Sequence, residues 1–288
     1  MALQEGTAGE TRTRVLPETR LLAAVIVPFL VAAWVILYLQ PDRTGDLFAW
    51  PVSPSMTAML LGGVYLGGAY FFVRAVFAPD WERIALGFLP VAGFATLMGV
   101  ATILHWDRFT SGHVAFWTWS VIYFTSPFLV LLVWWRNRRL SRTTGAGARR
   151  DELDLPGPAR TAARLLGLLA LAIAAVVFGR PALAVEAWPW TLTPLTARVT
   201  GAVFVLGGAG VGIARHPEWR SVRLMVQVAL LMLALVVGAT ARAWDEFDQG
   251  SVLTWVFVGW LLLVSAGSML LYVRMEAERR AQRSAVGS

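Results

Sequence analysis

Two histidines and an aspartate lie close together in the first half of the chain. His105, Asp107 and His113 flank one short segment, and imidazole and carboxylate groups are common ligands of divalent metals. Neutral imidazole also serves as an axial ligand of haem iron. Because the spacing matches no strong ligand motif, we interpret His105 and His113 as solvated side chains, keep a metal site as the weaker hypothesis, and expect no cofactor.

Tryptophan and aspartate also recur together. The element Trp-Asp-x-Phe occurs at 106–109 and again at 244–247. Indole rings prefer the headgroup level of a bilayer, so an aromatic belt explains most of this pattern. The nearby acids suggest, in addition, a weakly anionic vestibule that prefers cationic or neutral ligands. The residues assigned to this vestibule are Asp46, Trp50, Trp106, Asp107, Trp190, Trp244 and Asp245.

Other kinds of chemistry lack the residues to carry them. The chain has no cysteine, which excludes disulfides and thiolate metal sites. Neither a phosphate-binding glycine loop with lysine nor a Ser-His-Asp set of plausible spacing occurs. All Arg, Asp and Glu residues fall at or beyond the ends of apolar runs, which disfavours proton-coupled or sodium-coupled transport. We therefore expect a protein that is not an enzyme.

The segments that position these residues are long and apolar. Of the 288 residues, 57% are hydrophobic and 15% are charged, which is typical of a multi-pass membrane protein. Eight runs are long enough to cross a hydrocarbon core of about 30 Å. The sequence therefore predicts an all-α integral membrane protein with transmembrane helices at about 21–40, 55–78, 83–106, 114–135, 161–179, 194–215, 221–244 and 251–274.

Arginine is distributed unevenly between the two predicted sides. All 25 basic residues are Arg, which indicates a GC-rich bacterial genome, and 20 of them fall on the side that carries both termini. Cytoplasmic loops are enriched in basic residues, so we expect both termini inside a bacterial plasma membrane. The same asymmetry accounts for the net charge of +7. It predicts contact with anionic lipids at the cytoplasmic face of the bilayer, and no nucleic-acid partner.

The two halves of the sequence match at a nearly fixed offset. Trp81, Trp106 and Trp117 are each followed by another tryptophan 138 residues later. Each half contains four predicted helices, an even number, so the halves form two parallel four-helix repeats. The expected organisation is a cytoplasmic segment at 1–20, a first repeat at 21–135, an Arg-rich cytoplasmic linker at 136–160, a second repeat at 161–274 and a cytoplasmic tail at 275–288.

Glycines spaced four residues apart predict close helix contacts. Gly63 with Gly67, and Gly208 with Gly212, place small side chains on one helix face, where neighbouring backbones can approach. A packing role is the preferred interpretation, and a glycine-lined substrate path is the alternative.

One pattern resembles a known group of proteins. Phe48, Trp50, Pro51 and Pro54 lead into Thr57 and a glycine-rich helix, and a Trp-Asp-x-Phe loop follows. This arrangement resembles uncharacterised eight-helix membrane proteins of GC-rich, actinobacterial-type bacteria, over nearly the whole apolar part of the chain. The group has no known activity, so the resemblance implies no functional residues.

Two functions remain as hypotheses. The first is a non-enzymatic scaffold or partner subunit of a membrane assembly, with another membrane protein or a second copy as partner. An uncharged interior and small-residue faces favour such helix assembly. The alternative is a permease or binding protein for small neutral, hydrophobic or cationic molecules, which would use the seam between the repeats.

Overall fold

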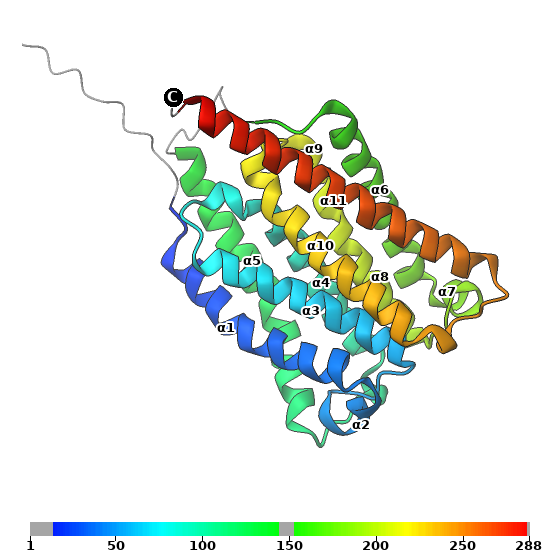
Figure 1. Ribbon diagram of the computed structural model, residues 1–288. Helices are drawn as coiled ribbons and strands as arrows, with labels where there is room; N and C mark the ends of the chain where they lie inside the picture. Colours follow the sequence, from blue (N-terminus) through cyan, green and yellow to red (C-terminus); the bar gives the residue numbers. More distant parts are fainter. Residues whose placement is uncertain (1–13, 144–152, 287–288) are drawn as a thin grey trace, which may run out of the picture.

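The computed structural model describes residues 14–143 and 153–286 (Figure 1). Over these residues the chain forms helices and no strand, and eight of the helices are long and apolar enough to cross a membrane. The predicted all-α fold with eight helices long and apolar enough to span a membrane is confirmed. In a bilayer a helix satisfies its own backbone hydrogen bonds, which is why apolar runs of this length fold this way.

The eight spans fall into four from each half of the chain. The first four are α1 (Pro17–Trp34), α3 (Ser55–Val76), α4 (Ala85–Leu104) and α5 (Val114–Thr143). The last four are α6 (Gly157–Gly179), α8 (Pro194–Val205) with α9 (Ala209–Arg215), α10 (Trp219–Arg242) and α11 (Val252–Val286). The short elements are the π-helical turn η1 (Val35–Leu39), η2 (Pro41–Arg43), α2 (Thr44–Leu47), η3 (Trp81–Arg83), η4 (Trp106–Arg108), α7 (Pro181–Ala187), η5 (Leu206–Gly208) and η6 (Trp244–Glu246).

Helices extend into the predicted linker and tail. Because α5 runs to Thr143 and α6 begins at Gly157, both ends of the expected 136–160 linker are helical. Residues 144–152 of that linker, and 1–13 of the expected N-terminal segment, lie outside the described residues. The expected tail at 275–288 continues α11 as far as Val286.

The sixth predicted run, 194–215, is interrupted by the 3-10 turn η5. Glycines bring its backbone onto α6 at this point. A Cβ placed on Gly167 would lie 3.1 Å from the Cα of Gly210, and one on Gly210 would overlap the carbonyl oxygen of Ala163. The two helices therefore meet backbone to backbone, which only glycine permits.

Four spans form the centre of the bundle. Helix α3 packs against α10, and α4 packs against α8 and α9, so each of these contacts joins the first half of the chain to the second. The remaining spans lie outside them, with α1 on α3, α5 on α4, α6 on α8 and α9, and α11 on α10 (Figure 1). The central helix α3 is the most buried span, with 78% of its apolar window buried, and the outer helix α11 is the least buried, with 6%.

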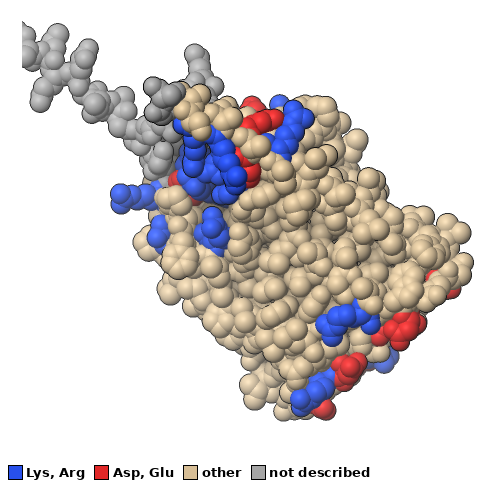
Figure 2. Space-filling view, in the orientation of Figure 1, with Lys and Arg blue, Asp and Glu red and all other residues tan. Residues whose placement is uncertain are grey.

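The bundle has two chemically distinct ends. Helix α1 begins and α11 ends at the same end, and Figure 2 shows charged side chains gathered at the two ends, with a surface between them that is nearly free of charge. We call the end with both termini the basic end; its arginines include Arg74, Arg83, Arg220, Arg223, Arg274 and Arg279. The opposite end is the aromatic end, defined by Trp50, Trp106, Trp188, Trp190 and Trp244.

Candidate functional sites at the two ends of the bundle

Two matched aromatic clusters close the aromatic end. The indole of Trp50 is buried among Phe48, Phe109 and Trp119, with ring centroids 4.7 to 5.1 Å away. In the second half Trp190 is buried in the same way, and its ring lies 5.2 to 5.5 Å from its neighbours, which are Trp188, Phe247 and Phe257. Rings at these separations stabilise a packed core beyond the apolar area they bury.

The same backbone hydrogen bond fixes each cluster. The N–H of Thr110 donates to the carbonyl of Ala49 at 3.0 Å, and the N–H of Asp248 donates to that of Pro189 at 2.9 Å. Each bond ties the loop before one span to the loop after another. Both loops are thus held rigidly against the end of the bundle.

The tryptophans predicted to line a vestibule separate into two kinds. Trp50 and Trp190 belong to the core, and the indole N–H of Trp190 donates to the Thr57 hydroxyl of α3 at 2.9 Å. Trp106 is exposed and Trp244 half-buried, so these two rings lie at the surface of the end. This division places only Trp106 and Trp244 where they can meet a ligand or lipid headgroups.

The predicted vestibule acids are exposed. Asp46, Asp107 and Asp245 all lie at the surface, and of the three only Asp107 has an ion pair within the described part of the chain. Its partner is the adjacent Arg108 at 3.2 Å, and both side chains are more than 70% exposed, so water screens the pair. The structure thus places these carboxylates in solvent rather than in a packed site.

The adjacent acid, Glu246, makes short contacts with a helix at this end. The two carboxylate oxygens of Glu246 accept backbone N–H groups from Ser55 and Met56, at 2.9 and 2.6 Å. These are the first residues of α3, whose N-terminal N–H groups have no partner inside the helix. Glu246 therefore caps a helix of the other half of the chain.

His105 is held by an arginine. The guanidinium of Arg198 donates to Nε2 of His105 at 2.5 Å, so that nitrogen carries a lone pair and the ring is neutral. Burial and the positive charge of Arg198 lower the pKa of His105 below its ordinary value. His113 lies half-buried in the next loop. Among the described residues no three His, Asp or Glu side chains are grouped closely enough to hold a metal.

The four predicted packing glycines all face neighbouring helices. A Cβ on Gly63 would lie 3.2 Å from that of Leu235, and one on Gly67 would overlap the side chain of Met232, so both glycines receive α10. A Cβ on Gly208 would lie 3.1 Å from Cδ2 of Leu171 in α6, and one on Gly212 would lie 3.2 Å from Cδ2 of Leu86 in α4. Between α3 and α10, Leu235 and Met232 fill the space where the two halves meet.

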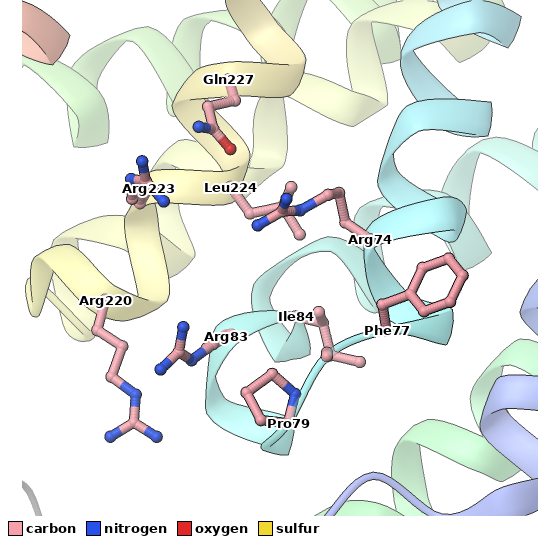
Figure 3. Close-up of a pocket in the computed structure, with 10 residues that line it drawn as sticks. Arg74, Phe77, Pro79, Arg83, Ile84, Arg220, Arg223, Leu224 and Gln227 are labelled. Carbon is pink, nitrogen blue, oxygen red and sulfur yellow. The ribbon is translucent and has the colours of Figure 1, made fainter.

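The basic end contains a pocket of about 140 Å³. It lies between the end of α3, the loop that leads to η3 and the first turns of α10 (Figure 3). Its lining residues are Arg74, Phe77, Ala78, Pro79, Arg83, Ile84, Arg220, Arg223, Leu224 and Gln227. Since one water needs only about 10–15 Å³ of such space, a group of several atoms fits.

A buried carboxylate organises one wall of this pocket. Asp80 is fully buried, and its Oδ2 accepts from Nε of Arg83 at 3.0 Å and from a guanidinium N–H of Arg220 at 2.5 Å. The preceding loop is itself fixed, because Arg20 donates to the carbonyl of Ala78 at 2.9 Å. A carboxylate this deeply buried requires such cationic partners.

A second carboxylate fixes the opposite wall. Arg223 forms a two-pronged pair with Glu276 of α11, at 2.6 and 3.1 Å, and the indole of Trp219 donates to the same carboxylate at 3.0 Å. Planar guanidinium groups in such forks are held in one orientation. Deeper in the pocket, the amide of Gln227 accepts from the Tyr70 hydroxyl and donates to that of Tyr272.

A smaller apolar groove of about 60 Å³ lies between α1, α3 and α5. At its base the hydroxyl groups of Tyr65 and Tyr123 share a hydrogen bond of 2.7 Å, and both rings are buried. The hydroxyls satisfy each other inside an apolar surround, which is how polar groups are retained in a membrane interior. The groove lies within the first half of the chain and not between the halves.

No protein-family model matches the chain, and comparisons with curated proteins and with solved structures find no match. The resemblance to uncharacterised eight-helix proteins stays a prediction.

Proposed function

We propose that this chain is a non-enzymatic membrane protein that serves as a scaffold or partner subunit of a membrane assembly. The single observation that carries the proposal is the position of α11. This helix packs mainly on α10, and 94% of its apolar window is unburied, the largest such share among the eight spans. A helix held from one side only presents the rest of its surface for contact with another protein.

The exposed surface of α11 has features that suit a helix partner. A Cβ placed on Gly259 or Gly267 would meet no atom within 4 Å, so the backbone is open to close approach at two points. Large apolar side chains, including Trp260 and Leu263, are exposed between them. At about 1.5 Å per residue the 35 residues of α11 extend roughly 50 Å, well beyond a hydrocarbon core of about 30 Å.

Cysteine crosslinking tests this assignment, because the natural chain has no cysteine. With Gly267→Cys in native membranes, a bifunctional thiol reagent or a photoactivatable maleimide should give one discrete product of higher mass. Val121→Cys on α5, where the native side chain is also exposed, provides the matched control. Mass spectrometry of the product then identifies either a second copy or another membrane protein. No product from α11, or equal products from α5, would contradict the proposal.

We also propose that the chain lies in a bacterial plasma membrane with both termini in the cytoplasm. The concentration of arginine at the basic end supports this orientation. Single cysteines test it directly: Ser111→Cys at the aromatic end should react with a membrane-impermeant maleimide in intact cells, whereas Ser284→Cys on α11 should react only after the cells are opened. The reverse pattern would refute the orientation.

The two halves are further proposed to be parallel four-helix repeats. Matched helix contacts support this, since α3 on α10 corresponds to α8 on α4 when the sequence offset is applied. The matched hydrogen bonds at Ala49 and Pro189, and the paired clusters around Trp50 and Trp190, support it independently. Expression of residues 14–143 and 153–286 as two chains should restore a stable complex, because the contacts between halves lie at the centre.

The permease hypothesis is the second candidate. The apolar groove beside Tyr65 and Tyr123 favours a small neutral or hydrophobic molecule, although it lies away from the predicted seam. Uptake of such molecules by vesicles that contain the purified chain would support it. Vesicles with Tyr65→Phe, which loses the shared hydrogen bond, provide the comparison.

A further inference from the structure

Four arginine side chains line the pocket at the basic end (Figure 3). Arg74 comes from α3, Arg83 from η3, and Arg220 and Arg223 from α10. We propose that this pocket binds the phosphate group of an anionic ligand. This binding site does not depend on the assembly role proposed above.

Three of these four arginines are paired with acids of the described part of the chain. Arg83 and Arg220 share a single oxygen of Asp80, and Arg223 shares Glu276 with Arg279. Arg74 has no ion pair with any described residue, and its guanidinium extends across the pocket toward α10 in Figure 3. One charged group is therefore left to meet a ligand.

The first turns of α10 add to the positive potential. Arg220 and Arg223 lie there, where backbone N–H groups carry the partial positive charge of the helix terminus; Glu218 is the N-cap residue, and the first turn itself contains no acid. Helix N-termini bind phosphate for this reason, and the planar fork of arginine matches the geometry of phosphate oxygens. The 24-residue length of α10 gives this terminus a full helix dipole.

The surface beside the pocket is apolar on one side. Phe77, which directly follows α3, is 77% exposed, and Val73 near the end of α3 is exposed next to Arg74. A phosphate held among the arginines could therefore carry an apolar chain along Phe77 and Val73. Two sources share this chemistry: the phosphate of an anionic phospholipid and a free inorganic or small soluble phosphate.

Native mass spectrometry of the full chain in mild detergent measures the binding. The probes are phosphatidylglycerol, diacylglycerol as a lipid without phosphate, and inorganic phosphate. Arg74→Gln removes the arginine that has no ion pair with a described residue, so no ion pair among these residues is broken. Arg280→Gln is the matched control, because Arg280 is exposed at the basic end, outside the pocket and without an ion pair in the described residues.

We expect Arg74→Gln to weaken binding of the first phosphatidylglycerol about tenfold, as loss of one charge-assisted hydrogen bond predicts. Arg280→Gln should leave the affinity within about twofold, Arg74→Lys should recover part of it, and diacylglycerol should bind far more weakly. Binding of phosphatidylglycerol alone identifies a lipid headgroup, and equal Arg74-dependent binding of inorganic phosphate identifies a soluble source; both support the site.

Three results would overturn the proposal. Equal losses for Arg74→Gln and Arg280→Gln would mean that general surface charge attracts the lipid. Diacylglycerol bound as tightly as phosphatidylglycerol would mean that only the tails are recognised. If neither phosphatidylglycerol nor inorganic phosphate bound, the pocket would not be a phosphate site. Unfolding temperatures of the variants without ligand verify that each one is folded.

Discussion

The carboxylate of Glu246 lies 2.6 Å from the backbone nitrogen of Met56, so an acid near the end of the chain caps a helix near its beginning. Helix α3 has no side-chain cap of its own, since its N-cap residue is Pro54. A carboxylate at this position both accepts the free N–H groups and faces the positive end of the helix dipole. The contact joins the two halves of the chain at the aromatic end.

Glu246→Gln should destabilise the protein by about 1–2 kcal/mol, because the cap loses its charge and one of its two acceptor oxygens. Asp245→Asn is the matched control, as this adjacent acid is exposed and makes no hydrogen bond with the described residues. Denaturant unfolding in detergent micelles measures both. Equal effects would show that the contact contributes nothing beyond surface charge.

Gly210→Ala should destabilise the bundle by about 1–3 kcal/mol, since the added methyl group would overlap the carbonyl oxygen of Ala163 and force α9 away from α6. Gly267→Ala adds the same group where no atom lies within 4 Å, so stability should be unchanged or up to about 1 kcal/mol higher. Thermal unfolding of the two variants is the comparison. A stable Gly210→Ala protein would mean that the helices separate at little cost.

Asp80→Asn should cost about 3 kcal/mol, because it removes the fully buried negative charge that Arg83 and Arg220 share. Asp107→Asn removes an exposed acid that is also paired with an arginine, and should change stability by less than about 1 kcal/mol. Both variants keep the shape of the side chain, so the difference between their free energies of unfolding reports the effect of burying the charge. Similar values would show that Asp80 is not structurally important.

Stability should fall as the pH is lowered through the range in which His105 titrates. The folded protein lowers the pKa of His105, so the unfolded chain binds the proton more readily. The stabilisation is complete above the unfolded pKa of about 6.5 and is lost progressively below it, until the folded-state pKa is passed. His105→Gln should flatten this part of the profile. A profile that stays the same in this variant would mean that another group causes the pH dependence.

The membrane spans could be predicted because a bilayer imposes one strong requirement. Apolar runs bounded by charge, Pro or Trp placed all eight helices to within a few residues at most ends, as in α3, predicted from residue 55 and beginning at Ser55. The lengths of α5 and α11 were underestimated, since their polar ends continue as helix beyond any bilayer limit. Which helices contact each other could not be read from hydropathy, because lipid-facing and protein-facing residues are equally apolar.

The sites at the ends were harder to predict for a related reason. Arg74, Arg83, Arg220 and Arg223 each fit the expected excess of charge on one side, and nothing in their spacing shows that they converge on one pocket. Asp80 lies beyond a helix end, as expected. Its burial against Arg220 of α10 could not be predicted from that position. Trp50 and Trp190 were grouped with surface tryptophans because their loop positions conceal their burial.

The pairing of α3 with α10 also means that α3 is synthesised well before its partner helix. Helix α3 ends at Val76, and its main partner in the second half begins at Trp219, so the ribosome must add more than a hundred residues before that partner exists. At about 5–20 residues per second this interval lasts roughly 7 to 30 seconds. Helix α3 has the lowest hydropathy of the eight spans and the most buried surface, so during this interval its glycine face is open to lipid or to the insertion machinery.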